Sequence, residues 1–246
     1  MSSCVNYPND LTTNLKNLLN TKKILNISVG GSGPYYQKEL LINLFDKNNT
    51  EFNTLVWLFY EGNDHEDLKK NFGKEYDFNF EINRNRNQQT IDLTKVNYSP
   101  SENTIVLKLK LFFANYFRGF GSLVKYLENY PMLIPKEEQY DSVVSDLSNY
   151  LTKKNVQKKI IFYIPVYTRL SYRDIKYPRP PHLKQFDQLK LLVENTAKKY
   201  DFEFVDGAAL FSKHNDPLDY FNYRLPTHFN IEGYKALAQF ISDELN

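Results

Sequence analysis

Residues 54–60 read TLVWLFY, and residues 61–64, EGND, follow at once. An uninterrupted run of aliphatic and aromatic side chains is typical of a strand that is buried on both faces of a sheet. Residues 159–166, KIIFYIPV, repeat this pattern, and shorter apolar runs occur at 24–29 (ILNISV) and 202–205 (FEFV). Helical patterns separate these runs. The sequence therefore predicts an α/β fold, a three-layer α/β/α sandwich around a doubly wound parallel sheet.

The rest of the chain fits a single domain over residues 1–246. Residues 72–102 are polar and lack clear periodicity, so we expect a polar insertion on the surface there. Apolar residues recur at helical spacing in several segments. We expect helices at 10–19, 35–45, 65–70, 103–117, 122–130, 137–153, 182–199 and 231–245.

Composition excludes several classes of protein. Lys and Arg number 31 against 29 Asp and Glu, and this net charge of +2 argues against a nucleic-acid surface. Cys4 is the single cysteine, and four histidines show no zinc-finger spacing, so we expect no internal disulfide, metal or cofactor. No apolar run approaches the roughly 20 residues that span a bilayer. The N-terminal residues lack the basic and apolar regions of a signal peptide, which indicates a cytoplasmic protein.

In doubly wound sheets, ligands bind beyond the carboxyl ends of the strands. Residues 30–33, GGSG, could offer backbone N–H groups to an anion or oxyanion, or form a tight turn that needs glycine. Asn63 could donate to an oxyanion or form a turn and helix cap. His228, just before the last helix, could act as a general base or merely pack in its loop. We expect the other histidines, His65, His182 and His214, on the surface.

Three segments together carry a family resemblance: 24–37 (ILNISVGGSGPYYQ), 55–64 (LVWLFYEGND) and 227–241 (THFNIEGYKALAQFI). In order and spacing they resemble the second, third and fifth sequence blocks of the SGNH/GDSL hydrolase superfamily, most closely a bacterial branch. The resemblance implies the flavodoxin-like SGNH hydrolase fold and acyl transfer from an ester of a small molecule or glycan. It makes Gly31 and Asn63 the oxyanion donors and His228 the base.

The chain departs from the family pattern at two places. Leu225 stands where the family has the Asp that orients the histidine, and Asp206 is a substitute only by its place at a strand end. The block with the first strand and the Gly-Asp-Ser nucleophile is absent, so the nucleophile is not identified. Ser2 and Ser3 are nearest to the required position, but no strand precedes them. On this alignment the nucleophile would lie a few residues upstream of the first residue.

Three functions therefore stay open. The first is a serine ester hydrolase or O-acyl transferase, and the second is a non-catalytic relative that kept the pocket for binding. Phosphate binding at residues 30–33 is the weakest, because no Walker lysine follows. Arg169 and Arg173, in the loop 167–181, could bind an anionic or polar substrate or be solvated. The sequence determines neither the ester nor the oligomeric state.

Overall fold

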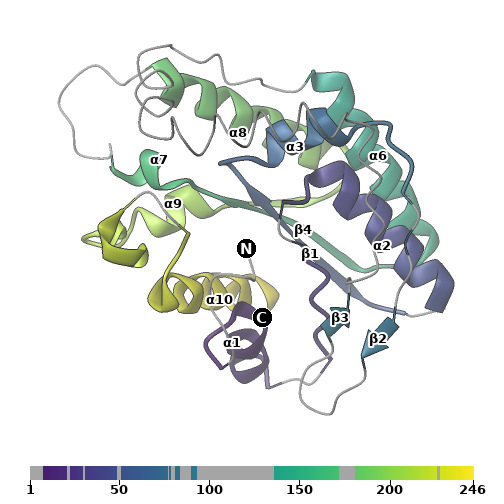
Figure 1. Cartoon of the computed structure of the whole chain (residues 1–246), viewed down its shortest axis with the longest axis horizontal. Helices are drawn as coiled ribbons and strands as arrows, with labels where there is room; N and C mark the ends of the chain where they lie inside the picture. Colours follow the sequence, from purple (N-terminus) through teal and green to yellow (C-terminus); the bar gives the residue numbers. More distant parts are fainter. Residues whose placement is uncertain are drawn as a thin grey trace, which may run out of the picture.

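The computed structural model describes residues 8–20, 23–29, 31–48, 51–76, 78, 81–83, 90–92, 136–171, 181–225 and 228–246. These residues build a parallel sheet in the strand order β1-β4-β5 (Figure 1). Strands β1 and β4 pair in register from Thr54 opposite Lys158 to Tyr60 opposite Ile164. The predicted α/β class with a parallel sheet is confirmed for these strands. Their bounds are β1 (Thr54–Tyr60), β4 (Lys158–Ile164) and β5 (Glu203–Asp206).

Strand β4 is buried on both faces, as its unbroken apolar sequence predicts. Successive side chains of a strand point to opposite faces of the sheet. Ile161 and Tyr163 accordingly belong to one apolar cluster, while Ile160 and Phe162 belong to another, and all four are at most 2% exposed. The sheet therefore separates two hydrophobic cores.

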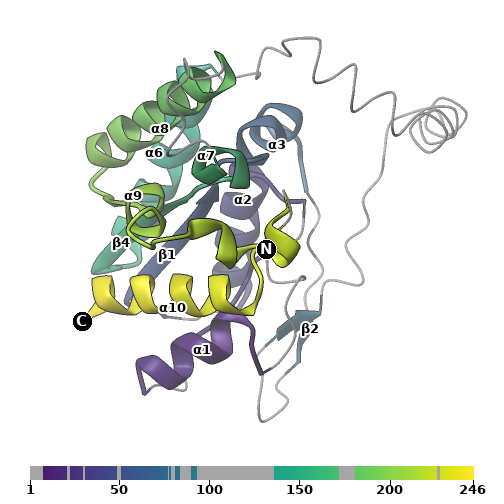
Figure 2. The same cartoon turned by 90° about the vertical axis from the view of Figure 1, so that its left-hand side faces the viewer.

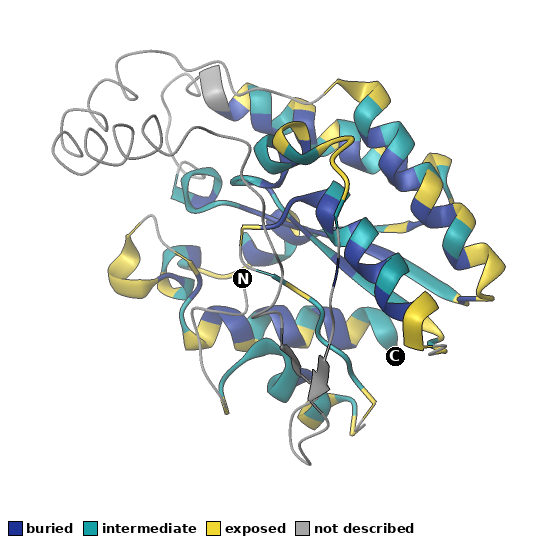
Figure 3. Ribbon diagram, turned by 45° about the vertical axis from the view of Figure 1, so that its right-hand side comes forward, coloured by how far each residue is buried: buried dark blue, intermediate teal, exposed yellow. Residues whose placement is uncertain are grey.

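Helices cover both faces of the sheet (Figures 1 and 2). Their inward faces are the buried ones, and the outward faces carry the exposed residues (Figure 3). The short helix α7 (Tyr167–Ser171) follows β4 directly, so the loop predicted over 167–181 is wrong for its first five residues. Two 3-10 turns, η1 (Pro217–Tyr220) and η2 (Asn222–Arg224), precede α10. One face carries α2 (Pro34–Asn48), α3 (Asp64–Asn71), α6 (Glu137–Lys153) and α8 (Pro181–Lys199), and the other carries α1 (Leu11–Leu18), α9 (Gly207–Phe211) and α10 (Ile231–Leu245).

The strand predicted at residues 24–29 is not formed. Within this segment only Asn26 makes a strand-type bridge. The apolar side chains are nevertheless used, because Ile24 packs against one core while Leu25 and Ile27 pack against the other. An apolar run specifies burial, whereas a strand also needs a continuous backbone ladder with a neighbour. The predicted burial of the apolar side chains at 24–29 is confirmed in part, and the predicted backbone hydrogen bonding of a strand is wrong.

The polar region 72–102 contains a short antiparallel pair of strands, β2 (Glu81–Asn83) and β3 (Thr90–Asp92). The expectation of a surface segment is wrong at Phe78, which is 1% exposed and packs against Tyr36 and Leu40. An isolated aromatic residue in a polar stretch shows no periodicity, which is why sequence patterning missed it. The helices expected at 103–117 and 122–130 lie outside the described residues. Across the described ranges, no helix is both long and apolar enough to cross a membrane.

Candidate functional site

The carboxyl end of β1 leads into a tight turn that starts α3. The Glu61 N–H donates to the Ile164 carbonyl at 3.0 Å, which extends the sheet ladder by one residue. The Asp64 carboxyl then reaches back and accepts from the Tyr60 N–H at 2.8 Å. These two bonds hold the intervening Gly62 and Asn63 at the edge of the sheet.

Asn63 is the N-cap residue of α3, but its side chain does not cap the helix. Its Nδ2 instead donates to Oδ2 of Asp67 at 2.6 Å, one helical turn ahead. Burial raises the pKa of Asp67 above its usual value. A primary amide has two N–H donors, so this bond leaves Asn63 a second N–H with which to bind an acceptor.

Gly31 occupies a turn that packs on the same helix. Its φ of +73° lies in the region that favours glycine, and a Cβ there would meet no atom within 4 Å. Gly33 touches α3 directly, since its Cβ would lie 2.6 Å from the carbonyl carbon of Asp67. The Ser32 hydroxyl donates to the Val29 carbonyl at 2.7 Å and closes the turn. The turn therefore adjoins the helix that Asn63 begins.

Two hydrogen bonds through the Gln37 side chain link this turn to β1, and sequence reasoning did not predict them. The Trp57 indole N–H donates to Oε1 of Gln37 at 2.6 Å. The Gln37 amide donates in turn to the Ser32 carbonyl at 2.8 Å. Trp57 is buried, so this connection fixes the turn to the sheet.

His228 lies near the end of β1 as well. Its ring centroid is 6.4 Å from that of Tyr60. Phe229, which is 4% exposed, forms a backbone bridge with Phe221 and anchors the loop. Nearby protein atoms partly desolvate the imidazole and lower the pKa of His228. A neutral imidazole at pH 7 is the form that accepts a proton.

Tyr60 joins the two parts of this region. Its ring occupies the space that a Cβ on Gly62 would need, so the ring lies against the turn that carries Asn63. The same ring neighbours His228. The structure thus brings the segments of Gly31, Asn63 and His228 to the carboxyl end of β1, while their chemical roles stay predictions.

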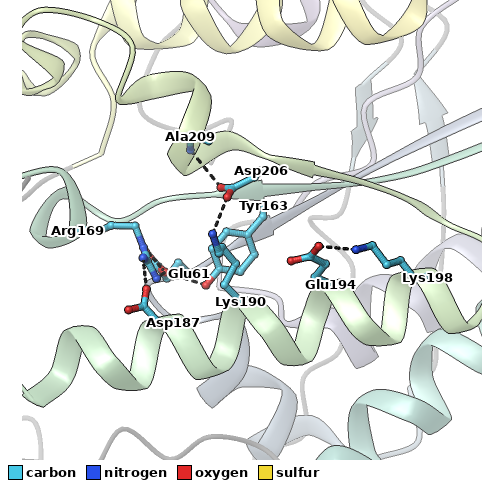
Figure 4. Close-up of polar contacts among 9 residues, drawn as sticks. All are labelled: Glu61, Tyr163, Arg169, Asp187, Lys190, Glu194, Lys198, Asp206 and Ala209. Atoms are coloured by element: carbon cyan, nitrogen blue, oxygen red, sulfur yellow. Dashed lines mark hydrogen bonds and ion pairs between the residues drawn. The ribbon is translucent and has the colours of Figure 1, made fainter.

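A buried ion-pair network lies beside this turn (Figure 4). The Glu61 carboxylate is 0% exposed and accepts from the Tyr163 hydroxyl at 2.8 Å and the Val166 N–H at 3.1 Å. Arg169 donates to it through Nε at 2.7 Å, and Nη1 of Arg169 lies 2.6 Å from Oδ1 of Asp187. The guanidinium is therefore already shared by two carboxylates.

The remaining predicted site residues make local contacts or lie outside the described ranges, and these contacts test none of their proposed roles. Asp206 caps α9 by accepting from the Ala209 N–H at 3.2 Å, and it pairs with Lys190 at 2.6 Å (Figure 4). Its role in orienting His228 stays a hypothesis. Arg173 and Ser3 lie outside the described residues. That Arg169 binds substrate also stays a prediction.

The expectation for His65 is wrong, because this histidine is 1% exposed rather than on the surface. Burial lowers the pKa of His65, and the backbone of Glu61 opposes part of this shift. Polar neighbours in the sequence suggested exposure. The signal for burial was the spacing of three to Leu68, which places both side chains on one face of α3. His214 is exposed as expected, and the side chain of His182 is not described.

The part of the chain that the structure describes holds no group of three or more His, Cys, Asp or Glu side chains arranged to bind a metal ion. Comparisons of the chain with protein-family models, curated proteins and solved structures gave no match. The resemblance to SGNH hydrolases therefore rests on the three sequence blocks alone.

Proposed function

We propose that the protein is an SGNH-type ester hydrolase or O-acyl transferase that acts on an acylated small molecule or glycan. The proximity of three distant segments at the end of β1 carries this proposal. Gly33 contacts α3 at Asp67, and Asn63 is the N-cap of the same helix. The ring of His228 lies 6.4 Å from that of Tyr60, the last residue of the strand.

In the proposed reaction, neutral His228 accepts the proton of a serine hydroxyl as its oxygen attacks the ester carbonyl carbon. The carbonyl oxygen gains negative charge and accepts hydrogen bonds from the Gly31 N–H and the second amide N–H of Asn63. The leaving alcohol takes the proton from His228, and an acyl-serine remains. Water then hydrolyses the acyl group, or an acceptor hydroxyl takes it. The serine of this scheme is not assigned to a residue.

We also propose that the sheet is part of a three-layer α/β/α sandwich of the SGNH type. The parallel order β1-β4-β5 and helices on both faces support this proposal. In the proposed fold the strand that carries the nucleophile would pair with the edge of β1 opposite β4, where no other strand of the described residues lies.

One observation favours the alternative, a non-catalytic SGNH-like binding or scaffold protein. The Asn63 amide is bonded to Asp67 at 2.6 Å, and the carboxyl oxygen that accepts this bond lies next to the proposed oxyanion site. Negative charge near a developing oxyanion opposes catalysis. A module that binds a neutral ligand would not meet this penalty.

Hydrolysis of p-nitrophenyl acetate and labelling by a serine-directed fluorophosphonate separate the two functions. If the protein is an enzyme, Asn63→Ala should lower kcat about 10²–10³-fold with little change in KM, because the oxyanion forms only in the transition state. His228→Ala should be at least as damaging, since the serine loses its proton acceptor. The control is His214→Ala, which removes another exposed histidine; its Nδ1 accepts from the Asp216 N–H at 3.1 Å, so circular dichroism checks that this variant is folded.

The outcomes divide clearly. Turnover that Asn63→Ala and His228→Ala reduce, and that His214→Ala leaves unchanged, supports the enzyme. Full activity in a folded Asn63→Ala or His228→Ala variant removes the assigned role of that residue. A wild-type protein with neither turnover nor labelling contradicts the enzyme and leaves the binding protein.

A further inference from the structure

Helix α7 contacts the part of the proposed site that carries Asn63. Arg169, in the middle of this helix, donates through Nε to both oxygens of Glu61, at 2.7 and 3.0 Å. Glu61 is two residues before Asn63 and is fully buried, so its carboxylate requires this cation. Arg169 is itself held from the other side by Asp187 of α8. Arg169 therefore holds the side chain at the start of the turn that carries Asn63.

The same helix contacts the part that carries His228. The hydroxyl of Tyr167 donates to the Arg224 carbonyl at 2.9 Å. The Tyr167 ring packs edge-on against Phe221, with the centroids 5.2 Å apart. Phe221 pairs through its backbone with Phe229, the residue after His228. The loop of the proposed base is thus held by Tyr167.

Helix α7 is itself firmly seated. Leu170 is 2% exposed and belongs to the core beneath the sheet, next to α10. At the start of the helix, the Val166 N–H donates to Oε2 of Glu61 at 3.1 Å. A five-residue helix fixed at its start and at its buried face can hold two side chains at a constant separation.

We propose that α7 sets the position of Asn63 relative to His228, with Arg169 and Tyr167 as its two positioning residues. This inference rests on the proposed function of that site. It assigns Arg169 a positioning role that rests on its contacts with Glu61 and Asp187. It also adds Tyr167, which no sequence pattern pointed to.

The physical reason is the steep dependence of acyl transfer on geometry. A displacement of about 1 Å at reacting groups can cost about 10²-fold in rate. Tyr167 and Arg169 are two residues apart on one helix, yet they hold segments that are more than 150 residues apart in the sequence, at about 61–63 and 221–229. A change in either contact alters the separation of the proposed base and oxyanion donor without touching either one.

The test uses two conservative variants and a control on the same helix. Tyr167→Phe removes only the hydroxyl, and Arg169→Lys keeps the charge but loses the planar fork that grips Glu61. Ser171→Ala is the control, because among the described residues its hydroxyl donates only to the Thr168 carbonyl inside the helix, at 3.0 Å. NMR follows the His228 ring and the Asn63 side-chain amide, each assigned from the loss of its signals in His228→Gln and Asn63→Ala.

Tyr167→Phe should shift the signals of the His228 ring and leave the Asn63 amide signals in place, and Arg169→Lys should do the reverse. Each should lower kcat about 10–100-fold with KM changing less than about threefold, because both variants alter transition-state geometry more than binding. Ser171→Ala should change none of these quantities.

Unchanged signals of both groups in folded Tyr167→Phe and Arg169→Lys would overturn the inference, as would equal changes in Ser171→Ala. The proposed function fails separately. If the wild-type protein has no turnover, the enzyme is contradicted, and the NMR signals still decide whether α7 positions the two groups.

Discussion

Replacing Asp64 by Asn should make the stability of the protein less dependent on pH. The Asp64 side chain is buried at the start of α3, and burial raises its pKa from 3.8 to about 8. Among the described residues, no Lys or Arg side chain forms an ion pair with it. The folded protein therefore holds Asp64 protonated at neutral pH, while the unfolded chain ionises it.

The free energy of unfolding therefore falls as the pH rises between the two pKa values of Asp64. Below pH 3.8 both states bind the proton, and Asp64 contributes its full stability. As the pH rises toward 8, the unfolded state gains by ionising while the folded state does not, so that contribution is lost. Each pKa unit corresponds to about 1.4 kcal/mol, which sets a ceiling of about 6 kcal/mol. Relaxation and water entry reduce such penalties, so we expect Asp64→Asn to be about 1–3 kcal/mol more stable than wild type at pH 9.

Urea unfolding at pH 5, 7 and 9 measures this effect. The single tryptophan, Trp57, is buried in the core and reports unfolding by fluorescence. The asparagine oxygen can still accept from the Tyr60 N–H, so the turn is kept. Asp243→Asn, on the exposed face of α10, controls for the loss of one charge. If the difference between Asp64→Asn and wild type is the same at pH 5 and pH 9, Asp64 does not titrate as described.

Two further predictions concern the turn at residues 31–33 and its support. Gly33→Ala should cost about 1–3 kcal/mol, because the added Cβ would lie 2.6 Å from the Asp67 backbone, whereas Gly31→Ala meets no atom and pays only for its φ of +73°, about 1–2 kcal/mol. We expect Gly33→Ala to be the more damaging of the two, and urea midpoints that rank Gly31→Ala as the more damaging change would contradict this order. Trp57→Phe should cost about 1–3 kcal/mol, because Oε1 of Gln37 loses its donor, and circular dichroism during unfolding checks it.

Local sequence patterns predicted the long amphipathic helices, because the spacing of apolar residues within a helix is visible in the sequence. Helix α6 spans Glu137–Lys153 and α10 spans Ile231–Leu245, as the apolar spacing indicated. In α10, Asn230 caps the first turn by accepting from the Gly233 N–H at 2.9 Å. The bond from Asn63 to Asp67 was also accessible, since a spacing of four places two side chains together on a helix.

Contacts between residues that are far apart in the sequence could not be predicted from local patterns. Glu61 and Arg169 are 108 residues apart, and nothing in either neighbourhood marks them as partners. The polar sequence around His65 likewise concealed its burial, which depends on what α3 packs against. The missing ladder at residues 24–29 has the same origin, because a strand is defined by its neighbour.

The acidic residues that follow β1 show how the fold manages charge at the proposed site. Glu61 is neutralised by Arg169, and Asp64 is protonated at neutral pH because burial raises its pKa to about 8. Asp67 accepts a bond from Asn63, and burial raises its pKa as well. An oxyanion beside Asn63 would then meet little opposing charge from Glu61 and Asp64, whereas negative charge on Asp67 would oppose it. Between pH 3.8 and about 8 the folded state loses stability because only the unfolded chain ionises Asp64, and above about pH 8 the ionised carboxylate of the folded protein would oppose the oxyanion. The same carboxyl group thus ties the stability of the α3 turn to the chemistry proposed for it.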